Sequence, residues 1–134
     1  MASNQPIIAL VDDDKIFQLT ASKTIKATNL TEQVLQFDNG EDALIFLREN
    51  IGNVNTLPDY IFLDINMPFV DGWMFLEDYA HLKNKLGKPV TIYMVSSSID
   101  PRDITRAKNN EHVSDYVIKP VTRERFIELL QKAA

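Results

Sequence analysis

The sequence predicts a doubly wound α/β fold built on a five-stranded parallel sheet. Five short apolar runs alternate along the chain with five segments of helical pattern, and no repeat or linker interrupts the series. Two of the runs, 7–11 and 60–63, are apolar throughout, which is typical of strands buried on both faces. Because parallel neighbours are joined by right-handed crossover helices, this order predicts helices on both faces of the sheet.

Each predicted strand is a short apolar run bounded by polar or turn residues. The five runs are 7–11, 33–37, 60–63, 90–95 and 116–118. The first run ends at three aspartates that begin with Asp12, and the third ends at Asp64. Turn-forming residues make 51–58 a loop, and the segment 66–72 leads from Asp64 into a helix.

Helical periodicity and capping residues place one helix after each strand. The predicted helices cover 15–28, 41–50, a segment after Gly72, 101–110 and a segment after Thr122, which could cap the last helix. Asp13 or Asp14 is placed to cap the first helix, and Asp100 caps the fourth. The expected inward residues are Ile16, Phe17, Ala21 and Ile25 in the first helix, Phe75, Tyr79, Leu82 and Leu86 in the third, and Phe126, Ile127 and Leu130 in the last.

Length and composition are those of one compact domain. With 134 residues and 45% hydrophobic content, we expect a single domain over 1–134 with a core over about 7–130. The sequence starts without a basic segment and has no apolar run of membrane length, which predicts a cytoplasmic protein that does not enter a membrane. The absence of cysteine excludes thiolate zinc sites and thiol catalysis. The net charge of −5 argues against direct nucleic-acid binding.

Polar side chains follow four of the predicted strands at their carboxyl ends. Three aspartates from Asp12 follow the first strand, Asp64 the third, Ser96 the fourth and Lys119 the fifth. Open parallel sheets bind ligands at this edge. If the first, third, fourth and fifth strands are neighbours, these groups converge.

Clustered carboxylates repel one another unless a cation holds them together. With no cysteine, and with neither histidine at a strand end, the available ligands are oxygens, which suit Mg²⁺ or Mn²⁺ better than Zn²⁺. Lys119 and the Ser96 hydroxyl would bind phosphoryl oxygens, and Asp64 could accept a phosphoryl group as an acyl phosphate. The strand ends therefore predict phosphoryl transfer to a carboxylate beside a bound cation.

Four short motifs occur in order at these strand ends. They are Val11-Asp12-Asp13, Leu63-Asp64-Ile65-Asn66-Met67-Pro68 with the turn pair Asp71-Gly72, Met94-Val95-Ser96, and Tyr116-Val117-Ile118-Lys119-Pro120. With these motifs the chain resembles the response regulator receiver family over nearly its whole length. The resemblance implies the flavodoxin-like strand order 2-1-3-4-5.

The resemblance also implies a role for each acidic position. Asp64 falls at the phosphorylated aspartate. Asp13 and Asp64 fall at the direct metal ligands, and Asp12 at an acid that acts through metal-bound water. The carbonyl group of Asn66 falls at the backbone metal ligand.

The remaining matches concern the phosphate and a conformational switch. Ser96 matches the hydroxyl position, Lys119 the lysine of the pattern, and Tyr116 the aromatic residue whose ring rotates as the hydroxyl moves toward the phosphate. The peptide bond before Pro120 is a candidate cis bond. Phosphorylation of Asp64 is therefore expected to shift the surface formed by the fourth helix, the fifth strand and the last helix.

The implied partners are proteins. A sensor histidine kinase or a histidine phosphotransfer protein would supply the phosphoryl group, and a downstream protein would bind the shifted surface. Because the last helix ends with the sequence, we expect a stand-alone receiver without an output domain. Its own chemistry would be limited to self-catalysed phosphorylation and dephosphorylation, and a homodimer remains open.

Three other functions compete with this hypothesis. Small phosphohydrolases of the haloacid-dehalogenase type also form an aspartyl phosphate. The motif of that family has a second acid two residues after the nucleophile, where this chain has Asn66, so the resemblance is weaker. A receiver-shaped module that is never phosphorylated has no physical reason to keep mutually repelling carboxylates. Flavin binding lacks a Gly-rich or Ser/Thr-rich phosphate loop after the first strand.

Overall fold

The computed structural model of the chain describes residues 5–31 and 33–132, and its sheet has the predicted topology. The strands are β1 (Ile7–Val11), β2 (Gln33–Phe37), β3 (Tyr60–Asp64), β4 (Thr91–Ser96) and β5 (Val113–Ile118). All neighbouring strands are parallel, in the order β2-β1-β3-β4-β5. The doubly wound, flavodoxin-like prediction is therefore confirmed.

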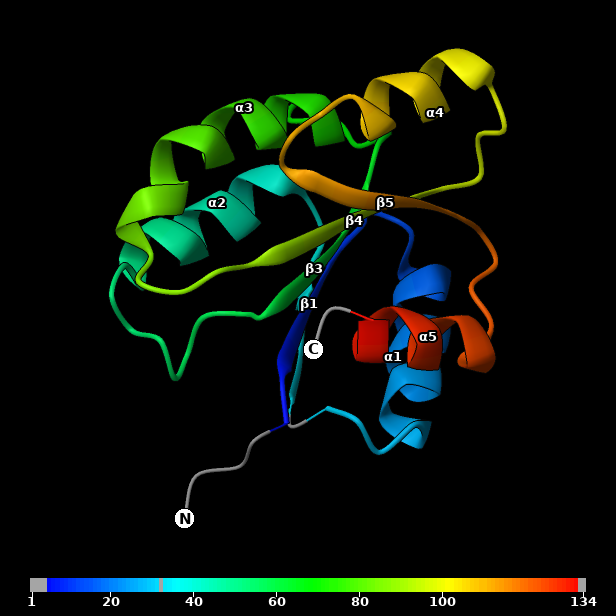
Figure 1. The fold of residues 1–134 in the computed structure, drawn as a ribbon, viewed down its shortest axis with the longest axis horizontal. Helices are drawn as coiled ribbons and strands as arrows, with labels where there is room; N and C mark the ends of the chain where they lie inside the picture. The colour runs from blue at the N-terminus through cyan, green and yellow to red at the C-terminus, as the bar shows by residue number, and fades with distance from the viewer. Residues whose placement is uncertain (1–4, 32, 133–134) are drawn as a thin grey trace.

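Helices cover both faces of this sheet (Figure 1). They are α1 (Lys15–Ala27), α2 (Gly40–Glu49), α3 (Gly72–Leu82), α4 (Pro101–Lys108) and α5 (Arg123–Lys132). The helices α1 and α5 pack on one face, and α2, α3 and α4 pack on the other. Among the described residues, no helix is both long and apolar enough to span a membrane.

Side chains of the central strands alternate between two cores. Leu10 and Phe62 pack with α1 and α5, whereas Leu63 packs with Phe75 of α3 on the other face. Every residue of β1 and of β3 is buried. Burying one large apolar side chain stabilises the fold by about 1.5–3 kcal/mol relative to leaving it exposed. The two strands that lead to Asp12 and Asp64 are therefore firmly held from both sides.

The helices begin at the expected capping residues. The Asp14 carboxylate accepts hydrogen bonds from two amide groups of the first turn of α1, at 2.9 and 3.1 Å. Asp100 caps α4 just before Pro101. The Thr122 hydroxyl accepts a hydrogen bond from the Arg125 amide at 3.1 Å. These bonds satisfy amide groups that a helix start leaves without a partner.

The predicted inner face of α1 is wrong in one place. Ile16 is 79% exposed, and the buried residues of this helix are Gln18, Ala21, Ser22 and Ile25. At 3.6 residues per turn, positions 16 and 25 lie on opposite sides of a helix, so one face cannot hold both.

Two boundaries and one inner face also differ from the prediction. The third helix ends at Leu82 and is followed by a 3₁₀ turn over Lys83–Lys85, although Leu86 is buried as expected. In α5, Leu129 is buried and Ile127 only half-buried. β5 begins at Val113, three residues earlier than predicted, and its register with β4 is irregular near this start.

Two buried tyrosines attach α5 to the sheet. The Tyr60 hydroxyl donates a hydrogen bond to the Leu130 carbonyl at 2.9 Å, and the Tyr93 hydroxyl donates one to the Leu129 carbonyl at 2.8 Å. Burial raises the pKa of both hydroxyl groups, that of Tyr93 to about 12. Both groups therefore remain protonated donors at neutral pH.

Candidate functional site

The carboxyl ends of four strands meet at one edge of the sheet, as predicted. Asp12 directly follows β1, Asp64 ends β3, Ser96 ends β4 and Lys119 follows β5. The registers place the end of β3 beside β4 and the end of β4 beside the end of β5. The strand order therefore brings the four predicted positions to one place.

Three carboxylates lie together at this edge. Asp12, Asp13 and Asp64 each offer an oxygen atom, and these atoms lie within 4.8 Å of one another. Asp12 is 1% exposed and Asp64 is 6% exposed, whereas Asp13 is exposed to solvent. One Asp12 oxygen accepts a hydrogen bond from the Asp14 amide at 2.9 Å. Two of the three charges are thus buried, and the third lies at the opening to solvent.

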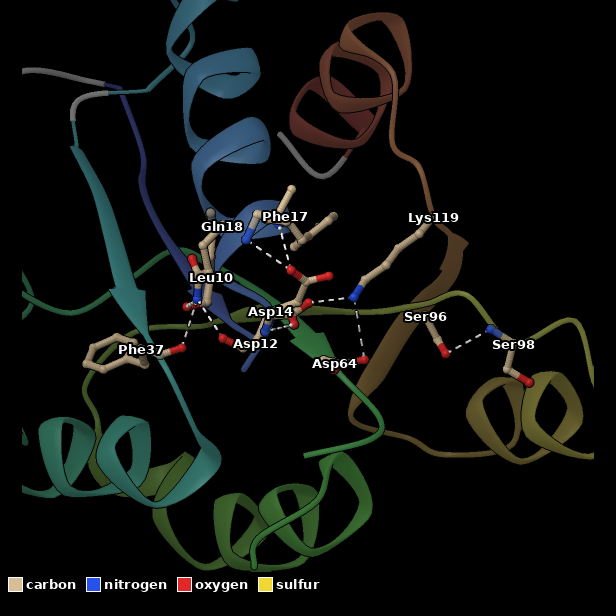
Figure 2. A network of polar contacts seen from close by, with 11 residues as sticks. Leu10, Asp12, Asp14, Phe17, Gln18, Phe37, Asp64, Ser96, Ser98 and Lys119 are labelled. Atoms are coloured by element: carbon tan, nitrogen blue, oxygen red, sulfur yellow. Dashed lines mark hydrogen bonds and ion pairs between the residues drawn. The ribbon is translucent and has the colours of Figure 1, made fainter. Parts of the chain in front are cut away.

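Lys119 reaches these carboxylates from the end of β5 (Figure 2). Its Nζ atom lies 2.8 Å from Asp12 Oδ2 and 3.9 Å from Asp64 Oδ1. The same atom lies 4.4 Å from the centroid of the Phe17 ring, in cation–π contact with α1. The peptide bond between Lys119 and Pro120 is cis, as predicted.

The site carries more negative charge than its lysine balances. Burial raises the pKa of the Asp64 carboxyl to about 7, and the charge of Asp12 raises it as well. The Lys119 ammonium group and a hydrogen bond from the Asn66 backbone amide act in the opposite direction. A second cation would therefore favour the ionised form of Asp64.

These residues fit a hard divalent cation. Asp12 Oδ2 is buried and is paired with the Lys119 ammonium group at 2.8 Å, and this single lysine faces the three carboxylates of the cluster. A donor set of carboxylate oxygens suits Mg²⁺ or Mn²⁺. Asp12, Asp13 and Asp64 are accordingly the side chains that could hold such an ion.

The loop after β3 passes very close to Asp64. The Gly72 amide donates a hydrogen bond to the Ile65 carbonyl at 2.8 Å. A Cβ atom on Gly72 would lie only 2.6 Å from the Asp64 carbonyl oxygen, so no side chain fits there. The preceding residue, Asp71, caps α3. The Asp71-Gly72 pair therefore does more than form a turn, because it lets α3 begin against the end of β3.

The predicted switch residues meet at Ser98. The Ser96 side chain is buried, and its hydroxyl oxygen accepts a hydrogen bond from the Ser98 amide at 3.1 Å (Figure 2). Tyr116 is 8% exposed, and its hydroxyl donates a hydrogen bond to the Ser98 carbonyl at 2.8 Å. The Ser98 hydroxyl in turn donates to Asp103 in the first turn of α4, at 2.8 Å. Ser98 thus connects both switch residues to α4.

Sequence reasoning did not predict the roles of Gln18 and Ser98. Gln18 is buried, and its side-chain amide donates hydrogen bonds to three backbone carbonyl groups near the end of β1. Its position three and seven residues before Ala21 and Ile25 was a usable signal, because that spacing places it on the inner face of the helix. Ser98 follows two other serines, and no pattern in the sequence distinguishes it from Ser97.

This arrangement can stabilise negative charge that is added to Asp64. The Lys119 ammonium group lies between the two buried carboxylates, and the carboxylate cluster can hold a divalent cation beside it. Fixed positive charges in a partly buried site are the groups that stabilise a transferring phosphoryl group.

Comparisons with known proteins agree with this geometry. The family described as response regulator receiver domain matches residues 8–131. The chain is 30% identical to the chemotaxis protein CheY of Listeria monocytogenes, over 93% of this chain and 96% of that protein. It is 31% identical to a Methanothrix harundinacea protein described as "Probable methanogenesis regulatory protein FilR2", over 88% of this chain and 74% of that protein.

Solved structures give the same result. The crystal structure of a two component response regulator from Cytophaga hutchinsonii superposes with a TM-score of 0.83 at 30% identity, covering 96% of this chain and 97% of that one. Other curated relatives are longer, and the chain spans only 44% to 46% of their length. The chain belongs to the response regulator receiver domain family.

Proposed function

We propose that this chain is a phosphoryl-accepting receiver of a two-component system, with Asp64 as the acceptor. A phosphohistidine of a sensor histidine kinase or a histidine phosphotransfer protein supplies the phosphoryl group. In this step a bond forms between an Asp64 carboxylate oxygen and phosphorus, and the bond between phosphorus and the donor's imidazole nitrogen breaks. The chain acts in the cytoplasm, and its own chemistry is limited to gaining and losing this phosphoryl group.

One observation carries the proposal: Lys119 Nζ lies 2.8 Å from Asp12 and 3.9 Å from Asp64 in a buried group of carboxylates. A lysine in this position balances charge on the phosphoryl oxygens as Asp64 attacks. Asp12, Asp13, Asp64 and the Asn66 carbonyl would hold Mg²⁺, for which Mn²⁺ could substitute. When bound, the ion supplies further positive charge beside the transferred group.

The response follows from the hydrogen bonds around Ser98. A phosphoryl group on Asp64 attracts the Ser96 hydroxyl, whose oxygen accepts a hydrogen bond from the Ser98 amide at 3.1 Å, and movement of the hydroxyl toward the phosphoryl group strains or breaks that bond. Tyr116 is bound to the same residue, so its environment changes as well. The surface formed by α4, β5 and α5 then binds a downstream protein, and neither nucleic acid nor a membrane is a direct target.

The test is labelling with acetyl phosphate in the presence of Mg²⁺. The parent protein should incorporate one phosphoryl group that is lost on treatment with hydroxylamine, as an acyl phosphate is. Asp64→Asn should abolish the label, because an amide cannot form this bond. Asp71→Asn is the matched control, since asparagine also caps helices and Asp71 lies outside the carboxylate cluster.

Three results would contradict the proposal. Label retained by Asp64→Asn would move the acceptor to another residue. Absence of label on the parent protein would favour an interaction module that is never phosphorylated. Rapid turnover of a generic phosphatase substrate would instead favour the phosphohydrolase.

A further inference from the structure

Gln18 is a buried polar side chain on α1, one turn inside the helix. It is 3% exposed, and its Nε2 atom lies 3.3 Å from the Leu10 carbonyl oxygen, 3.0 Å from that of Asp12 and 2.9 Å from that of Phe37. These carbonyl groups belong to the carboxyl ends of β1 and β2 and to the residue just beyond β1. One side chain thus joins a helix to two strands at the edge that carries the site.

The chemistry of the contact requires a hydrogen-bond donor at this position. All three neighbours are carbonyl oxygens, which only accept hydrogen bonds, so the NH₂ end of the amide must face them. Its oxygen, Oε1, has no partner among the described residues and is buried. An unsatisfied buried acceptor destabilises a fold, so packing alone does not account for an amide here. The NH₂ group binds carbonyl oxygens that an aliphatic side chain could not bind.

The contact of Gln18 with the Asp12 carbonyl group is the one that bears on the carboxylate site. The Asp12 amide still pairs with the Phe37 carbonyl at 3.1 Å, as in a sheet, but the chain then leaves the strand. Gln18 holds the Asp12 carbonyl group at this point, at 3.0 Å. On the other side of Asp12, its carboxylate is paired with Lys119 (Figure 2). The backbone and the side chain of Asp12 are therefore both held, by different elements.

We propose that Gln18 is a positioning residue that sets the affinity of the carboxylate site for a divalent cation. It fixes the backbone of Asp12, and hence the direction from which Asp12 and the adjacent Asp13 present their carboxylates to Asp64. This inference rests on the proposed function, because it assumes that the cluster holds Mg²⁺. Residues that orient metal ligands without touching the metal typically change metal affinity 10–100-fold when replaced.

The first experiment measures Mg²⁺ binding by isothermal titration calorimetry at low temperature, after circular dichroism has shown that each variant is folded. Gln18→Met keeps the length of the side chain and removes the donor, and we expect its Kd for Mg²⁺ to rise about tenfold or more. Ile25→Val is the matched control, a small change at a fully buried position on the same helix and in the same core. It should destabilise the fold slightly and leave the Kd within about twofold. Equal affinities of Gln18→Met and the parent would overturn the inference.

The second experiment uses the parent protein and does not depend on the folding of a variant. If the Gln18 bonds favour the cation-binding arrangement, linkage requires that the cation protect those bonds by the same factor. Hydrogen exchange of the Gln18 side-chain NH₂, followed by NMR, should therefore slow about tenfold or more at saturating Mg²⁺. Unchanged exchange would overturn the inference while leaving the proposed function intact. A parent protein that binds no Mg²⁺ would overturn both.

Discussion

Two helices on the same face of the sheet, α3 and α4, are held in very different ways. Both follow a strand that ends in a site residue, Asp64 for α3 and Ser96 for α4. The buried residues of α3 are Gly72, Trp73, Phe75, Leu76, Tyr79 and Leu82, whereas Ala107 is the only buried residue within α4. The helix beside the acceptor is thus anchored in the core.

The contacts of α4 are mostly polar and lie near the surface. Its first turn is bound through Asp103 to Ser98, and Arg106 lies over the Trp73 ring at 4.2 Å from the centroid. Ile104 adds a partly buried apolar contact. Such contacts break at a lower free-energy cost than a packed core. If Asp64 is phosphorylated as proposed, we expect α3 to keep the acceptor in place and α4 to change position.

The largest expected difference is in stability. Phe75→Ala in α3 removes a fully buried ring and should lower the free energy of unfolding by about 3–5 kcal/mol. Ile104→Ala in α4 removes a half-buried side chain and should cost about 1 kcal/mol. Urea denaturation of both variants measures the two losses. Similar losses would show that the helices are held equally firmly.

The second effect is a pH dependence of the acceptor. The pKa of Asp64 in the folded chain, about 7, lies above the ordinary value of 3.8 for an aspartate, so folding favours the protonated form. Without Mg²⁺, the ionised carboxylate therefore destabilises the fold fully above about pH 7, and this penalty disappears as the pH falls toward 4. Asp64→Asn should accordingly be more stable than the parent by a few kcal/mol at pH 8, and by much less at pH 4.

Denaturation in EDTA at both pH values measures this difference. Addition of Mg²⁺ at pH 8 should stabilise the parent more than Asp64→Asn, because the ion offsets the repulsion. A stability difference between the two proteins that does not change with pH would contradict the raised pKa.

A third, intermediate effect is expected where α3 begins. Gly72→Ala would place a Cβ atom 2.6 Å from the Asp64 carbonyl oxygen and 2.8 Å from the Met94 methyl group. The backbone must move, so the unfolding free energy should fall by about 1–3 kcal/mol, and labelling of Asp64 by acetyl phosphate should slow.

Gly40→Ala is the matched control, because Gly40 is the first residue of α2 and its Cβ atom would meet Val70 at a less severe 3.0 Å. It should leave labelling close to that of the parent. Normal labelling of Gly72→Ala would mean that the start of α3 does not position the acceptor.

The smallest expected effect is on α4 alone. Ser98→Ala removes the hydrogen bond to Asp103 and the one accepted from the Asp100 amide, and it should cost about 1 kcal/mol or less. Amide hydrogen exchange should become faster in α4 and stay unchanged in α3. Ser97→Ala replaces the exposed neighbouring serine and should change neither helix. Faster exchange in both helices would remove the distinction between them.

The alternation of strands and helices and the positions at the strand ends could be predicted because they depend on short, local signals, whereas the strand order 2-1-3-4-5 is an implication of the family resemblance. The apolar runs before Asp12 and Asp64 mark strands buried on both faces, and a parallel sheet brings their ends together. β5 was harder to delimit, because it lies at the edge of the sheet and Ser114 is exposed while Asp115 is only partly buried. An edge strand with such residues lacks the continuous apolar run of a central strand.

The contacts of single side chains were less predictable, because they depend on distances between elements. Hydrophobicity predicts Ile16 on the inner face of α1, whereas the helix turns Gln18 inward and leaves Ile16 exposed. The bonds of Gln18 join α1 to β1 and β2, and no local pattern reports such a triple contact. The same holds for Ser98, whose partners Ser96 and Tyr116 come from two strands.

The attachment of α5 to the sheet has a consequence for any protein that binds the surface formed by α4, β5 and α5. Its carbonyl groups at Leu129 and Leu130 are bound by hydroxyl groups of Tyr93 and Tyr60, which belong to the two strands that end in Ser96 and Asp64. In the proposed switch, α5 is therefore the helix held to the sheet, and α4 beside β5 is the one expected to move. A partner that contacts both helices would bind α5 in the same way in both states and α4 in only one of them. It could therefore distinguish two states that differ by a small shift of α4.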